Sequence, residues 1–105
     1  MRLLKTETDH IAKSLAQNLD GISFKVYLFG SRVHDQKRGG DIDLLLLVSP
    51  FDFEKVYGLK SLLNYDLQGV LGEQKIDLTL ATEAMLMSDV FLASIKDEMV
   101  EIFSY

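Results

Sequence analysis

The feature that most constrains the fold is an unbroken aliphatic run, Leu44 to Val48, which directly follows Asp41-Ile42-Asp43. A strand that is apolar at every position must be buried on both of its faces, so it belongs in the centre of a covered sheet. We therefore expect an α/β (α+β) fold, with a small mixed β-sheet of three to four strands flanked by helices.

Periodicity predicts the neighbours of this central strand. Apolar residues recur every four positions in Thr8 to Leu19, as on one face of a helix, and Gly21 supplies the left-handed conformation that commonly ends one. Phe24 to Phe29 alternates with period two and predicts a strand. Lys75 to Leu80 is predicted to form another strand. In that strand one face carries Ile76, Leu78 and Leu80, and the other carries Asp77 and Thr79.

A helix is expected after the central strand. Ser49 is the predicted N-cap, Pro50 the first helical residue, and Asp52 the second member of a capping-box-like pair. Gly69 and Gly72 bracket its predicted end. Its apolar stripe is formed by Phe53, Val56, Tyr57, Leu63 and Leu67.

The final segment, Glu83 to about Phe103, has few helix breakers and is predicted to be one helix. Its apolar residues cover more of the circumference than a single contact with the sheet requires. Two interpretations stay open. The helix is either deeply packed in its own core, or it exposes part of its surface to a protein partner or a second copy, as in a homo-oligomer.

Composition narrows the class of protein. We expect the 105 residues to form a single domain, 1-105, because a chain of this length is long enough for one core, and its 48% apolar and 26% charged residues are typical of a globular protein. The absence of cysteine excludes disulfides, thiol catalysis and zinc–thiolate sites. No signal-peptide core and no run of about 20 apolar residues occurs, so we expect a cytoplasmic protein without a membrane partner.

The formal net charge of -5 counts against binding to a nucleic-acid backbone, because that affinity depends mainly on lysine and arginine. A small molecule or a protein is the expected second substrate. A local group such as Arg32, Lys37 and Arg38 can still bind phosphate within an acidic chain.

Three aspartates predict a metal site. Asp41 and Asp43 are two residues apart at the start of the central strand, so both carboxylates project from one face. Asp77 holds the corresponding early position in the next strand, and the three converge if these strands are neighbours. Magnesium is normally held by one or two carboxylates together with substrate phosphates. Two such ions could clamp the attacking and leaving oxygens of a phosphoryl displacement.

The turn after the first strand predicts a phosphate site. Gly30 allows close approach of the backbone to a ligand, and Ser31 offers an N–H and a hydroxyl. Arg32 could add a bidentate donor, or it could be a solvated loop charge. Each piece alone is common. The combination of a strand, Gly-Ser, Asp-x-Asp opening a buried strand and a third aspartate in the following strand is what points to nucleotide chemistry.

Three stretches now indicate a family. Leu28-Phe29-Gly30-Ser31-Arg32, Gly40-Asp41-Ile42-Asp43-Leu44-Leu45 and Lys75-Ile76-Asp77-Leu78 resemble the minimal nucleotidyltransferases of the DNA polymerase β-like superfamily. These proteins are the bacterial antitoxin partners of HEPN-domain toxins, and kanamycin nucleotidyltransferase is a larger relative. The resemblance covers roughly Phe24 to Leu80. One departure is the Gly39-Gly40 pair, which stands where a polar residue often precedes the first aspartate.

The resemblance implies a polymerase β-like fold and the transfer of a nucleoside monophosphate, AMP from ATP, to a hydroxyl. In a type VII-like toxin–antitoxin pair that hydroxyl belongs to a tyrosine of the HEPN partner. Asp41 and Asp43 would bind two magnesium ions, Asp77 would complete the site and help to deprotonate the hydroxyl, and Gly30 and Ser31 would hold the triphosphate.

Competing chemistries fit less well. In haloacid-dehalogenase-like phosphatases and many glycosyltransferases the Asp-x-Asp pair follows a hydrophobic strand, whereas here it precedes one. No P-loop is present, and His10 and His34 lack the spacing of ligands or of a triad. Two alternatives stay open: a non-catalytic nucleotide-binding subunit that neutralises or stabilises its partner by contact, and transfer to a small antibiotic.

Overall fold

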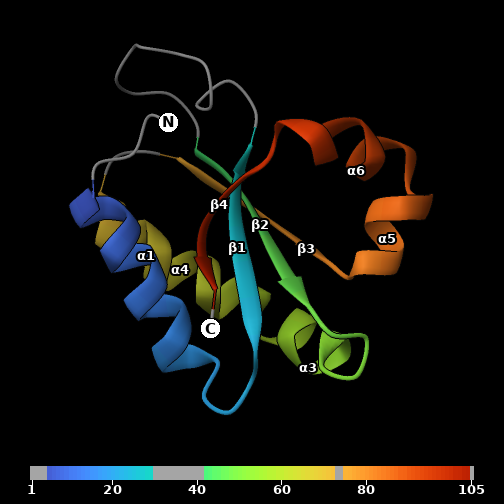
Figure 1. Ribbon diagram of the computed structural model, residues 1–105. Helices are drawn as coiled ribbons and strands as arrows, with labels where there is room; N and C mark the ends of the chain where they lie inside the picture. The colour runs from blue at the N-terminus through green and yellow to red at the C-terminus, as the bar shows by residue number, and fades with distance from the viewer. Residues whose placement is uncertain (1–4, 30–41, 73–74, 105) are drawn as a thin grey trace.

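The structure is a computed structural model, and it describes residues 5–29, 42–72 and 75–104. Within those ranges it is a four-stranded sheet with helices on both faces (Figure 1). The elements are α1 (Lys5–Asn18), β1 (Phe24–Phe29), β2 (Ile42–Val48), α3 (Phe53–Gly58), α4 (Lys60–Leu71), β3 (Ile76–Ala81), α5 (Glu83–Ser88), α6 (Val90–Ile95), the 3-10 turn η1 (Lys96–Glu98) and β4 (Val100–Ser104).

The sheet is mixed and has the strand order β3-β2-β1-β4. β1 runs antiparallel to β2 and β4, whereas β2 and β3 are parallel. The predicted α+β class, with a small mixed sheet flanked by helices, is therefore confirmed. The predicted strands Phe24 to Phe29 and Leu44 to Val48 are also confirmed, although β2 begins two residues earlier and so includes Asp43.

Alternation along β2 divides the core into two layers. Leu44 and Leu46 belong to the larger cluster, which also contains Leu15 of α1 and Leu63 of α4. Leu45 faces the opposite way, into the second cluster. That cluster consists of Phe29, Leu45, Leu47, Ala81, Leu86 and Leu92. Figure 1 shows α1 and α4 on one side of the sheet and α5 and α6 on the other, so β2 is buried on both faces as its sequence requires.

The predicted first turn of the helix after β2 is wrong. Ser49 and Asp52 do interact, since the Ser49 hydroxyl donates to Asp52 Oδ2 over 3.1 Å and accepts from the Asp52 N–H over 3.3 Å. Together with the bond from the Asp52 N–H to the Ser49 carbonyl, this closes a turn, and the helix begins only at Phe53. The predicted single helix is in fact two helices, α3 and α4, which are separated at Leu59. Tyr57, which was predicted to lie in the apolar stripe, is 61% exposed.

The prediction of one long final helix is also wrong. Asp89 has an extended backbone (φ -82°, ψ 128°), and its carboxylate accepts from the Leu92 N–H over 3.1 Å, so the chain stops α5 and starts α6. Val100 to Ser104 instead form the edge strand β4, which pairs with β1 with a shift of register between Val26 and Tyr27. No helix in the described part of the chain is long and apolar enough to span a membrane.

Candidate active site

Asp43 and Asp77 lie side by side on the two parallel strands. The register pairs Ile42 with Ile76, Asp43 with Asp77 and Leu44 with Leu78. Neighbouring strands are about 4.8 Å apart, so the two carboxylates start from backbones at that separation. The predicted convergence of the three aspartates depended on these strands being neighbours, and that condition is met for Asp43 and Asp77.

Both carboxylates lie on the α5–α6 face of the sheet. In β2 the residues two and four positions after Asp43, Leu45 and Leu47, belong to the second cluster, and in β3 Ala81 occupies the same face as Asp77. Asp43 is half-buried and Asp77 is exposed. The apolar cover by α5 and α6 therefore ends before Asp77, and this end of the face is open to solvent.

The third strand at this place is β1. Its last residue, Phe29, pairs with Asp43 across the antiparallel ladder. The end of β1 thus lies beside the start of β2, and residues 30–41 form the segment between them in the sequence. Asp41, Gly30, Ser31 and Arg32 belong to that segment and lie outside the described residues, so their predicted roles stay predictions.

The donor set at this place fits magnesium. No group of three or more metal-binding side chains occurs within residues 5–29, 42–72 and 75–104, and Asp41 lies outside them. Proteins usually supply a magnesium ion with only one or two carboxylates, and water and phosphate oxygens provide the other ligands. Asp43 and Asp77 are enough to meet that requirement. The chemistry of Asp43 and Asp77 therefore agrees with the ion that the sequence implies.

An aromatic contact that the sequence did not predict extends the site toward α6. The rings of Phe29 and Phe91 meet edge to face with centroids 6.3 Å apart. Phe91 is nevertheless 56% exposed, so one part of its ring contacts the sheet and another part faces solvent. The sequence analysis predicted one long helix here and so could not predict this contact. The contact depends on the direction of α6, which is set by the break at Asp89.

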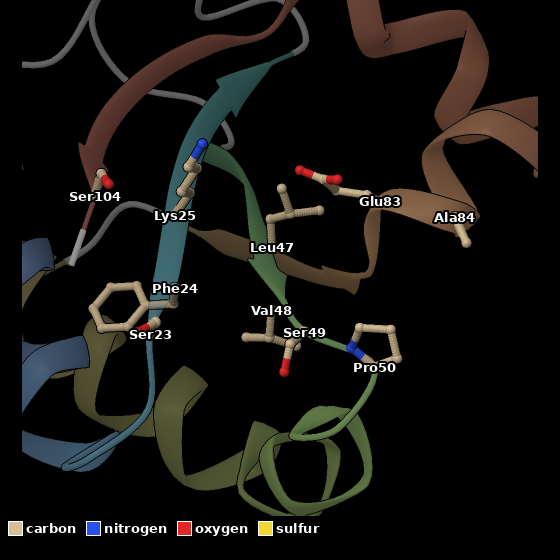
Figure 2. Close-up of a pocket in the computed structure, with 10 residues that line it drawn as sticks. All are labelled: Ser23, Phe24, Lys25, Leu47, Val48, Ser49, Pro50, Glu83, Ala84 and Ser104. Carbon is tan, nitrogen blue, oxygen red and sulfur yellow. The ribbon is translucent and has the colours of Figure 1, made fainter.

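A pocket of about 420 Å³ lies at the other end of the same face (Figure 2). Lys25 of β1, Leu47 of β2 and Glu83 of α5 surround it, with Ser49 and Pro50 at its edge. The strand register puts Phe24 beside Val48 here and Phe29 beside Asp43 at the far end, about 17 Å along β2. This pocket is therefore separate from the pair of aspartates.

A second hollow, of about 430 Å³, lies on the α1–α4 side and is lined by His10, Lys13, Ser14, Gln17 and Asp66. It too is separate from the aspartates. His10 thus lines a surface hollow and has no part in the aspartate site.

No protein-family model matches this chain, and a comparison with curated proteins finds no match either. The interpretation of the site therefore depends on its residues and their geometry.

Proposed function

We propose that this protein is a magnesium-dependent nucleotidyltransferase of the minimal, polymerase β-like type. It transfers a nucleoside monophosphate, AMP from ATP, to a hydroxyl group and releases pyrophosphate. The observation that supports the proposal most directly is the in-register pair of Asp43 and Asp77 on one open face, beside the end of β1. The Gly30-Ser31 turn follows that strand in the sequence, where it could hold the triphosphate.

The roles of the aspartates follow from their exposure. The half-buried Asp43, together with Asp41, is suited to hold metal ions next to the nucleotide, whereas the exposed Asp77 can also meet an incoming hydroxyl. Magnesium bound there would neutralise phosphate charge and orient the leaving pyrophosphate. As the acceptor oxygen bonds to the α-phosphorus, the bond to pyrophosphate breaks, and the hydroxyl proton passes to the Asp77 carboxylate.

The acceptor in this proposal is a tyrosine of a HEPN-type protein partner, and the protein acts as a type VII-like antitoxin in the cytoplasm, where ATP and magnesium are available. The net charge of -5 supports a protein acceptor over nucleic acid.

The test looks for a HEPN-type reading frame beside this gene and measures the intact mass of its product after incubation with the full chain, ATP and magnesium. The partner is expected to gain the mass of one or more AMP groups. Asp43→Asn and Asp77→Asn should each reduce the rate at least about 100-fold. The matched control is Asp20→Asn, an exposed aspartate near the opposite end of the sheet, which should transfer at the wild-type rate.

Transfer at the wild-type rate by both site variants would contradict the proposal, as would an unmodified partner at every nucleotide tried. The absence of a HEPN-type reading frame beside the gene would contradict the assigned acceptor and leave the transfer reaction itself to be tested with other hydroxyl acceptors.

A second function, neutralisation by contact alone, is favoured by one specific observation. Met87, Val90 and Phe91 are large apolar residues that remain exposed on α5 and α6. A variant with Asn at Asp41, Asp43 and Asp77 separates the two functions. Partner binding with loss of neutralisation supports catalysis, whereas unchanged neutralisation supports a nucleotide-binding subunit that acts by contact.

A further inference from the structure

Three large apolar side chains that are close in the sequence, on α5 and α6, are exposed to solvent. Met87 is 77% exposed, Val90 87% and Phe91 56%. We call these three residues the α5–α6 surface. The buried residues of the same helices, Leu86 and Leu92, already hold them on the sheet, so the α5–α6 surface is not needed for that contact. Exposed apolar residues grouped in this way mark protein interaction sites more often than isolated ones do.

The α5–α6 surface is connected to the pair of aspartates by direct contacts. Phe91 packs edge to face against Phe29, and Phe29 pairs with Asp43 on β2. Opposed residues in an antiparallel pair have Cα atoms about 4.5–5.5 Å apart. A protein that covers Phe91 would therefore reach the open end of the sheet face where Asp77 is exposed.

The charges of residues 83–98, the stretch that contains the α5–α6 surface, indicate what kind of partner fits it. Residues 83–98 contain four carboxylates and one ammonium group, and all five side chains are exposed. They are Glu83, Asp89, Lys96, Asp97 and Glu98. A partner with an apolar centre and basic residues around it would complement both features.

The same charges disfavour a second copy of this chain. A two-fold dimer brings the same patch of both subunits together, so two acidic rims would face each other. Like charges across an interface oppose association. The occupant is therefore a different protein.

We propose that the α5–α6 surface is the docking site for the protein acceptor, which presents a basic rim and delivers its hydroxyl to the end of the sheet at Asp43 and Asp77. The proposal rests on the proposed transferase function and adds where the acceptor binds. It places the acceptor site on this domain itself.

The experiment measures binding of the HEPN-type protein used above to the full chain by biolayer interferometry. Val90→Asp and Met87→Glu place a charge on the docking surface without touching the core. Each should raise Kd at least about tenfold, as expected for central contacts of an interface. The matched control, Tyr65→Glu, alters a residue of α4 that is 78% exposed on the other side of the sheet, and it should change Kd by less than about twofold.

Salt and self-association provide two further readouts. Raising sodium chloride from about 50 to about 500 mM should weaken partner binding, because screening weakens the contact between basic and acidic rims. The wild-type chain should sediment as a monomer. A concentration-dependent dimer that Val90→Asp abolishes would assign the α5–α6 surface to a second copy and overturn the proposal.

The outcomes separate this proposal from the transferase function. Val90→Asp should lose partner modification while still binding ATP in the presence of magnesium, and Asp43→Asn should lose modification while still binding the partner. Wild-type partner affinity in both surface variants, or equal loss in Tyr65→Glu, would overturn the docking site alone. Circular dichroism checks that each variant is folded.

Discussion

We expect the carboxylates of Asp43 and Asp77, which are paired in register on neighbouring strands, to repel each other when no cation is bound. Asp43 and Asp77 lie opposite each other on neighbouring strands, and like charges in that position destabilise a sheet by a few tenths to about 1 kcal/mol. In EDTA, Asp77→Asn should therefore unfold at a slightly higher temperature than the wild type. Magnesium should raise the Tm of the wild type, because it binds the folded state, but should raise that of the variant much less. Thermal denaturation followed by circular dichroism measures both effects.

The control for this experiment is Asp20→Asn, which should respond to magnesium as the wild type does. Equal magnesium stabilisation of wild type and Asp77→Asn would show that Asp77 takes no part in binding the cation. This readout is independent of any enzymatic activity.

Two glycines differ in what their backbone requires. Gly21 follows α1 with φ +80°, a conformation that L side chains rarely adopt, whereas Gly69 lies inside α4 with open space where a Cβ would stand. Gly21→Ala should lower the free energy of unfolding by about 1–2 kcal/mol. Gly69→Ala should raise it by about 0.5–1 kcal/mol, because alanine favours a helix. Urea unfolding of the pair gives the comparison, and the same sign of change in both variants would contradict this interpretation.

At the scale of elements, the strength of the local pattern decides what the sequence could predict. The buried run of β2, the alternation of β1 and β3, and the end of α1 shortly before Gly21 were all predicted, because each is specified by neighbouring residues. The register of Asp43 with Asp77 followed from their equivalent places in two strands. The roles of Asp41, Gly30, Ser31 and Arg32 are still predictions.

Helix was predicted for the residues of α5 and α6, but the break between them and the strand β4 were missed because their signals depend on tertiary contacts. An aspartate can occur inside a helix, so Asp89 alone does not predict a break. The break is seen only in the structure, where the Asp89 carboxylate accepts from the Leu92 N–H and caps the start of α6. Val100 to Ser104 can continue a helical pattern, yet the open edge of β1 offers a ladder of hydrogen bonds that favours a strand. The α5–α6 surface depends on these breaks, so the sequence pattern predicts only that part of this segment could expose an apolar face.

The strand β4 contributes to stability through its aromatic contact with β1. The rings of Phe103 and Phe24 lie 5.8 Å apart, and Phe103 packs against the larger core cluster. Phe103→Ala should lower the free energy of unfolding by about 1–3 kcal/mol, less than for a fully buried phenylalanine. Phe51→Ala is the matched control, because Phe51 is 97% exposed and should change stability by less than about 0.5 kcal/mol. Equal effects in urea unfolding would argue against β4 as part of the sheet.

At the scale of the whole molecule, the two core clusters share the same strands. Leu45 and Leu46 are adjacent in β2, both 0% exposed, and point into opposite clusters. Neither helical layer can leave the sheet without exposing one face of β2 to water. We therefore expect residues 1-105 to unfold as one cooperative domain.

Leu45→Ala and Leu46→Ala test this expectation. Each should lower the free energy of unfolding by about 2–5 kcal/mol, the usual effect of a cavity in a packed core. Because both clusters unfold together, far-UV circular dichroism and tyrosine fluorescence should give the same urea midpoint for each variant. If Leu45→Ala instead separates the two transitions, the α5–α6 layer unfolds on its own, and the docking surface then lies on a layer that can detach from Asp43 and Asp77 while α1 and α4 stay packed on the sheet.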